Sequence, residues 1–149
     1  MSYMDQPIQG SLEYWAQLKP DEAAIIDENG SVLTWQEWNR QSDILAEAFE
    51  RAGLRPKDIV AVRSQIRPEW FVVNRALAKI GCMQIGLNWH FTLPEVLHVM
   101  KDSGACAVVF DDPTPDPLLP LWDELPLKTM LAINTTRHPE VEPYEKLIS

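Results

Sequence analysis

The sequence has few basic residues and no long apolar run. Its 149 residues include 13 Lys and Arg against 22 Asp and Glu, which gives a formal net charge of −9 at pH 7. Nucleic acid and anionic membranes bind basic surfaces, so neither is an expected partner. No stretch approaches the roughly 20 apolar residues of a transmembrane helix, and no secretory signal is visible at the N-terminus. These absences predict a cytoplasmic protein.

Cysteine and known catalytic motifs are also scarce. The two cysteines, Cys82 and Cys106, lie in apolar segments that predict strands, so we expect buried thiols and no disulfide or metal site. The sequence contains no G-x-S-x-G, H-E-x-x-H or C-x-x-C motif. Its six tryptophans are not interleaved with basic residues, which favours an apolar layer over a base-stacking platform. We therefore predict no catalytic residue and no metal ligand.

The composition and the N-terminal segments indicate one globular domain over residues 1–149. The hydrophobic fraction is 46% and the charged fraction is 23%, as in soluble globular proteins. Ser11 is a suitable N-cap for a short helix. Asn29-Gly30 lies between two short apolar runs and predicts a β-hairpin. The apolar side of the short helix is formed by Leu12, Trp15 and Leu18.

From about residue 58, predicted strands and helices alternate. Apolar runs predict strands near 58–64, 83–87 and 105–110, and capped amphipathic segments predict helices near 68–80 and 93–103. This alternation indicates βαβ crossovers and a parallel sheet. Capping boxes, Thr-x-x-Glu, open the helices that begin after Thr34 and Thr92. "KTMLAI" predicts a further strand, and "YEKLIS" predicts the start of a helix.

Gly81 and Gly86 have the spacing of two glycines in a phosphate-binding loop, but their surroundings do not fit. Leu87-Asn88 stands where that loop has Lys-Ser/Thr. The order is also reversed, because Gly81 is predicted to close a helix and Gly86 to lie in the next strand. We favour a helix cap at Gly81 and a close-packing position at Gly86.

Asn88, Trp89 and His90 are the candidate binding residues for a cofactor. They follow the carboxyl end of a predicted strand, where α/β sheets place ligand crevices. His90 could act as a proton donor or a polar contact. No carboxylate or nucleophile at a recognised spacing accompanies it, so a simple loop contact is favoured.

The remaining polar candidates favour solvated positions. His98 lies on the polar face of its predicted helix, and His138 has no partner pattern. Asp111, Asp112 and Asp116 are interrupted by prolines and lack the glycine and glutamate of a calcium loop. A solvated acidic turn is the favoured interpretation.

The order of segments resembles the N-terminal portion of the adenylate-forming superfamily, which includes acyl-CoA synthetases, coumarate ligases, luciferases and peptide-synthetase adenylation domains. "LTWQEWNRQSDILAEAF" is similar to the family's L-T/S-Y-x-E-L motif, and "LAKIGCMQIGLN" is similar to L-K-A-G-A-x-x-V-P-L-N. "FTLPEVLHVMKDSGA" is similar to the stretch that follows. The resemblance covers roughly residues 10 to 149. Departures at Trp35, Trp38, Cys82 and Gly86 all fall at structural positions.

The resemblance implies an ATP-dependent, AMP-forming acyl-CoA synthetase as the parent enzyme, with ATP, Mg²⁺ and CoA as cofactors and a carboxylic acid as substrate. "NWHFT", in place of N-P-R-L-T, is most similar to synthetases of fatty and related acids. The family's lysine-containing Ser/Thr/Gly-rich loop and its other catalytic motifs have no counterpart in this sequence. The chain alone is therefore expected to be inactive and to bind none of these cofactors. The last predicted helix is barely begun at Ser149, so a truncated part of a larger domain is expected.

Two partners and two alternatives follow. The remainder of the adenylate-forming enzyme is one expected partner. A second copy is the other, since Trp70, Trp89 and Phe91 are expected to leave an apolar patch that drives homodimer formation. A non-catalytic interaction or regulatory module of the same fold is one alternative. An unrelated nucleotide-binding domain is the other, and the lack of G-x-G-x-x-G argues against it.

Overall fold

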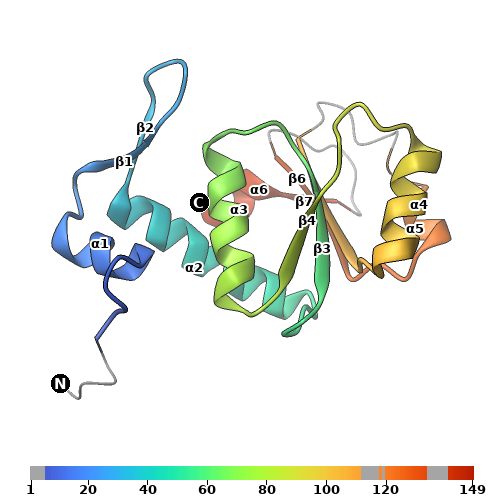
Figure 1. Cartoon of the computed structure of the whole chain (residues 1–149), viewed down its shortest axis with the longest axis horizontal. Helices are drawn as coiled ribbons and strands as arrows, with labels where there is room; N and C mark the ends of the chain where they lie inside the picture. Colours follow the sequence, from blue (N-terminus) through green and yellow to red (C-terminus); the bar gives the residue numbers. More distant parts are fainter. Residues whose placement is uncertain (1–5, 112–117, 119, 134–140) are drawn as a thin grey trace.

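The computed structural model describes residues 6–111, 118, 120–133 and 141–149. Helices and strands follow one another along this part of the chain (Figure 1). Their order and bounds are α1 (Leu12–Leu18), β1 (Ala23–Ile26), β2 (Val32–Thr34), α2 (Trp35–Arg51), β3 (Ile59–Arg63), α3 (Pro68–Lys79), β4 (Met83–Gly86), α4 (Leu93–Ser103), β5 (Ala107–Phe110), α5 (Leu121–Glu124), β6 (Thr129–Ala132), β7 (Glu142–Pro143) and α6 (Tyr144–Ile148).

Among the described residues, five strands form one parallel sheet in the order β4-β3-β5-β6-β7. Strand β3 lies between β4 and β5, with Val60 opposite Gln84 on one side and Ala107 on the other. Strands β6 and β7 continue the sheet in the same direction. The predicted parallel βαβ arrangement is therefore confirmed, as are the strand in "KTMLAI" and the helix in "YEKLIS".

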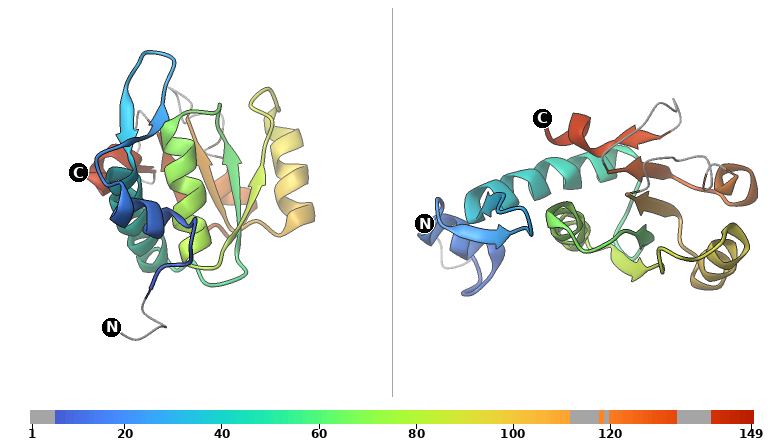
Figure 2. Two further views of the ribbon diagram at one scale, coloured as in Figure 1. Left: turned by 60° about the vertical axis from the view of Figure 1, so that its left-hand side comes forward. Right: turned by 90° about the horizontal axis from the view of Figure 1, so that it is seen from above.

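Helices cover both faces of this sheet. Figures 1 and 2 show α2, α3 and α6 on one face and α4 and α5 on the other. In β5, Ala107 and Val109 pack with the α2 and α3 side chains, whereas Val108 and Phe110 pack with those of α4 and α5. All four are fully buried. Their alternation follows the two-residue period of a strand, and a run without polar residues is what a strand covered on both faces requires.

Strands β1 and β2 form a separate antiparallel hairpin that extends away from the main sheet (Figure 1). The Asp27 carboxylate accepts hydrogen bonds from the backbone N–H groups of Asn29 and Ser31, both at 2.8 Å. Gly30 has φ 82°, a conformation that costs glycine little. The predicted hairpin with Asn29-Gly30 in its turn is confirmed.

The two predicted capping boxes differ. At α4 the Glu95 carboxylate accepts the Thr92 backbone N–H at 2.7 Å, as predicted, and this bond lowers the pKa of Glu95. At α2 the Thr34 hydroxyl accepts the Glu37 N–H at 3.2 Å, but the Glu37 carboxylate binds Arg40 instead of reaching back. Only half of that box forms, because a guanidinium is a stronger donor than a neutral backbone N–H.

Aromatic rings connect α1, α2 and α3. Neighbouring centroids along this row are 5.1 to 6.2 Å apart, a range in which aromatic pairs attract. The Trp38 indole N–H also donates to the Phe71 carbonyl oxygen at 3.2 Å. The row consists of Tyr14, Trp15, Trp35, Trp38, Phe71 and Trp70. It confirms an apolar layer for these tryptophans. Leu18, predicted on the apolar side of α1, is instead 57% exposed, because α1 ends there and packs through Leu12 and Trp15.

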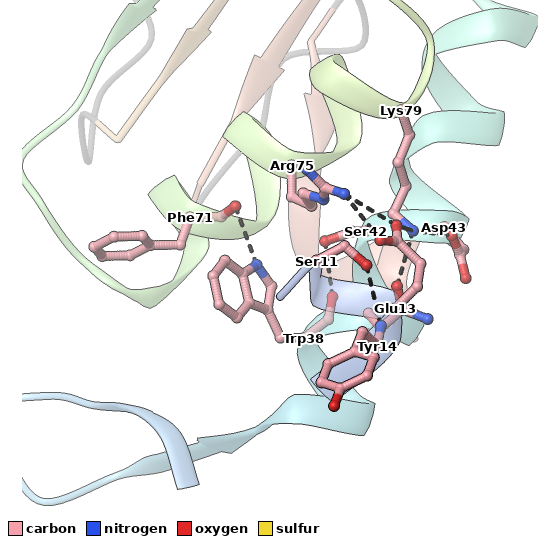
Figure 3. A network of polar contacts seen from close by, with 10 residues as sticks. Ser11, Glu13, Tyr14, Trp38, Ser42, Asp43, Phe71, Arg75 and Lys79 are labelled. Atoms are coloured by element: carbon pink, nitrogen blue, oxygen red, sulfur yellow. Dashed lines mark hydrogen bonds and ion pairs between the residues drawn. The ribbon is translucent and has the colours of Figure 1, made fainter. Parts of the chain in front are cut away.

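An ion-pair network also fixes α1 to α3 and α2 (Figure 3). The Glu13 carboxylate lies 2.9 Å from both Arg75 Nη2 and Lys79 Nζ, and Lys79 Nζ lies 2.7 Å from the Asp43 carboxylate. Partial burial acts to raise the pKa of Glu13, but the Lys79 hydrogen bond and the charges of Lys79 and Arg75 outweigh it and lower this pKa to about 2.

We predict that Glu13→Gln lowers the free energy of unfolding at pH 7 by about 0.5–1 kcal/mol. A depressed pKa stabilises the fold above the ordinary pKa of 4.5, and this stabilisation is lost as the pH falls from there towards 2. The gap between wild type and variant should therefore close over that window in urea denaturation. Glu47→Gln, at an exposed ion pair, is the control. A gap that stays constant down to pH 2 contradicts the assignment.

Candidate functional site

The carboxyl ends of β3, β4 and β5 meet at one edge of the sheet, the position where parallel α/β sheets bind ligands. Three segments form this edge: residues 64–67 after β3, residues 87–92 after β4, and Asp111 after β5. The candidate residues Asn88, Trp89 and His90 lie in the second segment and are all exposed. The sheet therefore places them where the sequence predicts.

The loop after β4 uses these residues mainly to hold its own shape. The Asn88 side-chain oxygen accepts the His90 backbone N–H at 2.9 Å, and the Asn88 carbonyl accepts the Phe91 N–H at 2.9 Å. The Trp89 and His90 rings lie against each other, with centroids 3.5 Å apart. Nothing in this geometry activates His90 as an acid or a base. The favoured interpretation, a loop contact, agrees with it.

Arg63 is a residue of this edge that sequence reasoning missed. It ends β3, and its guanidinium donates to the Trp89 carbonyl oxygen at 2.7 Å. The loop after β4 is thus attached to the end of the neighbouring strand. The available signal was the single charged residue that closes the apolar run "IVAVR".

Asp111 corrects another expectation. Its carboxylate accepts the Ser64 hydroxyl and the Gln65 backbone N–H, both at 3.0 Å, and lies 4.0 Å from Arg67 Nη1. The side chain is 15% exposed, so it is not part of a solvated turn. The parallel pairing of β3 and β5 brings the two strand ends together, and the carboxylate satisfies polar groups of the neighbouring loop. Asp112 and Asp116 lie outside the described residues.

The two glycines behave differently from each other. Gly81 has φ 74° just after α3, and a Cβ at this position would lie 3.3 Å from the Pro56 Cβ, so its role as a helix end is confirmed. Gly86 was predicted at a close-packing position, and this is wrong. It is exposed, and a Cβ there would meet no atom within 4 Å, because β4 is the edge strand of the sheet.

The other candidates contribute no chemistry to this edge. His98 is exposed, as predicted, and His138 lies outside the described residues. Cys82 and Cys106 are free thiols, and burial raises the pKa of both. In the part of the chain that the structure describes, no group of three or more His, Cys, Asp or Glu side chains is placed to hold a metal ion. No helix there is long and apolar enough to cross a bilayer.

A cleft of about 780 Å³ lies beside this edge. The β1–β2 hairpin forms one wall, and α6 forms another. A third wall is the segment of residues 65–69, which comprises the end of the loop after β3 and the start of α3. Gln41 and Tyr144 also line it, and the Tyr144 hydroxyl contacts the Gln41 side-chain oxygen at 3.2 Å. Asp111 is shared between this cleft and the sheet edge.

Adenylate-forming enzymes have a parallel sheet of this kind, with helices on both faces. The comparison with known sequences gives the same family. Residues 12–147 match the AMP-binding enzyme family. The chain belongs to this family and corresponds to its N-terminal portion.

Individual relatives show how much of the family the chain represents. It is 30% identical to the fatty acid–[acyl-carrier-protein] ligase ScoC of Streptomyces coeruleorubidus, over 86% of this chain and 24% of ScoC. It is 31% identical to a feruloyl-CoA synthase of Amycolatopsis sp, over 63% of this chain and 19% of the relative. The acetoacetyl-CoA synthetase of Streptomyces lividans has the same fold, with a TM-score of 0.82 at 24% identity over 93% of this chain and 24% of the synthetase. The chain spans a quarter or less of each relative's length.

We predict that Arg63→Met loosens the loop after β4. The substitution keeps the aliphatic stem but removes the donors to the Trp89 carbonyl, which should cost about 1–2 kcal/mol of stability. Amide hydrogen exchange at residues 89–91 should accelerate more than exchange in β5. Arg51→Met, at an exposed ion pair on α2, is the control. Equal exchange rates in wild type and Arg63→Met would show that the hydrogen bonds within the loop are sufficient to stabilise it.

Proposed function

We propose that this chain is the N-terminal part of an ATP-dependent, AMP-forming acyl-CoA synthetase. Membership of the AMP-binding family over residues 12–147 is the observation that carries the proposal. In the proposed reaction, a carboxylate oxygen of the acid attacks the α-phosphorus of ATP and pyrophosphate leaves. The CoA sulfur then attacks the acyl carbonyl carbon of the adenylate, the thiol proton is released, and AMP leaves.

The relatives support an acid–thiol ligase and leave two acceptors to separate. The name feruloyl-CoA synthase gives CoA as the acceptor of the acid, whereas the name of ScoC gives acyl-carrier protein as the acceptor of a fatty acid. We propose CoA as the acceptor and a fatty or related carboxylic acid as the substrate. The carrier-protein thiol is the second candidate, because ScoC matches over 86% of this chain.

Within such an enzyme we propose a supporting role for this chain. The described residues do not fit MgATP, because they contain neither a phosphate-binding loop nor a carboxylate cluster for the metal. ATP, Mg²⁺ and CoA would therefore be held by residues elsewhere in the parent protein. We propose the cytoplasm as its location, in keeping with the free thiols of Cys82 and Cys106.

We predict that the purified 149-residue chain releases no pyrophosphate when given ATP, Mg²⁺, fatty acid and CoA. The same assay on a polypeptide that includes the remaining family length should show acid-dependent release, followed by acyl-CoA formation. Transfer to acyl-carrier protein alone would select the second acceptor. Acid-dependent release by the 149 residues alone contradicts the supporting role, and no release by the longer polypeptide favours the non-catalytic module.

We also predict that the isolated chain forms a homodimer. Of the three aromatic side chains expected on an exposed patch, Trp89 is 48% exposed, whereas Trp70 and Phe91 are half-buried. Trp89 follows edge strand β4, which contains no charged residue and whose Met83 is 51% exposed. An exposed edge strand without charges favours strand pairing between chains.

Sedimentation equilibrium tests this association. Met83→Lys should shift the chain towards monomer, because a charge on an edge strand opposes pairing. Leu18→Lys, at a side chain of similar exposure on α1, should not. A wild-type monomer at high concentration would overturn the prediction.

A further inference from the structure

The cleft between the hairpin, the segment of residues 65–69 and α6 has an exposed apolar rim. Ile26 and Val32 form a cross-strand pair on the hairpin and are 65% and 56% exposed. Ile66, in the segment of residues 65–69, is 78% exposed. All three side chains line the same cleft of about 780 Å³. Apolar side chains gathered around one hollow indicate a binding surface, because isolated exposed aliphatic groups are otherwise scattered.

The charge of the cleft is one-sided. Five carboxylates line it, against one guanidinium, that of Arg67. Several of these carboxylates already have partners within the chain: Asp27 closes the hairpin turn, Asp111 binds the loop after β3, and Glu69 lies 2.9 Å from Arg67 Nε. The complete acidic set is Asp27, Glu28, Glu69, Asp111 and Glu145. A ligand that fits this cleft combines apolar groups with positive charge.

This combination argues against the small molecules of the proposed reaction. ATP, acyl adenylate, CoA and a fatty carboxylate are all anions, and a concentration of carboxylates repels them. A second copy of this chain is also disfavoured at this cleft, because a chain with 13 Lys and Arg against 22 Asp and Glu has few basic side chains to pair with the carboxylates. A polypeptide segment with Lys or Arg beside aliphatic side chains satisfies both the rim and the charge.

We propose that this cleft docks a basic, apolar segment of the same AMP-binding enzyme, contributed by the part of the protein that follows this region in its relatives. The proposed function enters this inference at one point, which is that the docking segment comes from the same enzyme. ScoC is about four times the matched length, and the match to the family ends at residue 147, within α6. Since α6 is a wall of the cleft, the chain that follows in such relatives departs beside it.

Docking here also gives the hairpin a structural reason. A two-stranded sheet is marginally stable alone in water, and the Ile26–Val32 pair is more than half exposed, so a segment in the cleft would bury it further. The segment would therefore complete a small apolar cluster of which this chain supplies one half. Its basic side chains would be paired by the rim carboxylates.

The experiment uses the 149-residue chain and a fluorescent peptide of about ten residues in which Lys and Val alternate. Fluorescence anisotropy should show binding that weakens with salt, and the same peptide with Glu in place of Lys should not bind. Ile66→Ser should weaken binding about tenfold, the loss expected for one aliphatic contact. Ile8→Ser, which removes the same kind of side chain at a similarly exposed position that does not line the cleft, is its matched control.

A second pair of variants separates the cleft from general attraction to an acidic protein. Glu28→Gln with Glu145→Gln and Glu47→Gln with Glu50→Gln change the net charge equally, but only the first pair lines the cleft. The first should weaken binding several-fold and the second should not. Equal effects of the two pairs, equal effects of Ile66→Ser and Ile8→Ser, or no binding would overturn the proposal. So would conversion of a wild-type dimer to monomer by Ile66→Ser, which would assign the cleft to a second copy. None of these readouts depends on ligase activity.

Discussion

Burial of strand β5 on both faces is the constraint from which most of this structure follows. Its four side chains are fully buried, so helices must cover the sheet on each side. A strand in that position pairs through its backbone with β3 and β6, and short apolar strands joined by helices pair in parallel. Parallel pairing brings the carboxyl ends of strands to one edge. At that edge Arg63, the last residue of β3, lies next to Asp111, the residue after β5, although the two are far apart in sequence.

Helix α2 transmits this arrangement to the N-terminal segments. Its Leu45 and Phe49 belong to the core beside the sheet, whereas its first turn holds Trp35 and Trp38 in the aromatic row. The row and the Glu13 ion pairs fix α1 onto the same helix layer. The hairpin, which leads directly into α2, is therefore held at a set distance from the loop after β3. The cleft is the space that this geometry leaves open.

The sequence predicted the elements well because each is specified by neighbouring residues. Caps at Ser11 and Thr92, the Asn29-Gly30 turn and apolar runs at the strands all act within a few positions. The roles of Asp111 and Gly86 were wrong for the opposite reason. Asp111 depends on the loop after β3 and Gly86 on being in an edge strand, and both depend on strand order. Local sequence patterns do not predict the order of strands in a sheet. The contact of Arg63 with a neighbouring loop was missed for the same reason.

The structure shows where part of the excess of acidic residues lies. Lys79, Arg75 and Lys128 are engaged in ion pairs that hold helices and strands together. The cleft keeps five carboxylates and one guanidinium. A ligase of the proposed kind handles three anionic substrates and must neutralise charge on a phosphoryl group, which requires cationic groups or metal ions close to it. Among the described residues, most Lys and Arg side chains already form ion pairs within the chain, so few of them remain for that task. Under the proposed function, this part of the enzyme therefore contributes the covered sheet and a docking surface that is acidic and apolar. The positive charge comes from the part of the enzyme that docks against it.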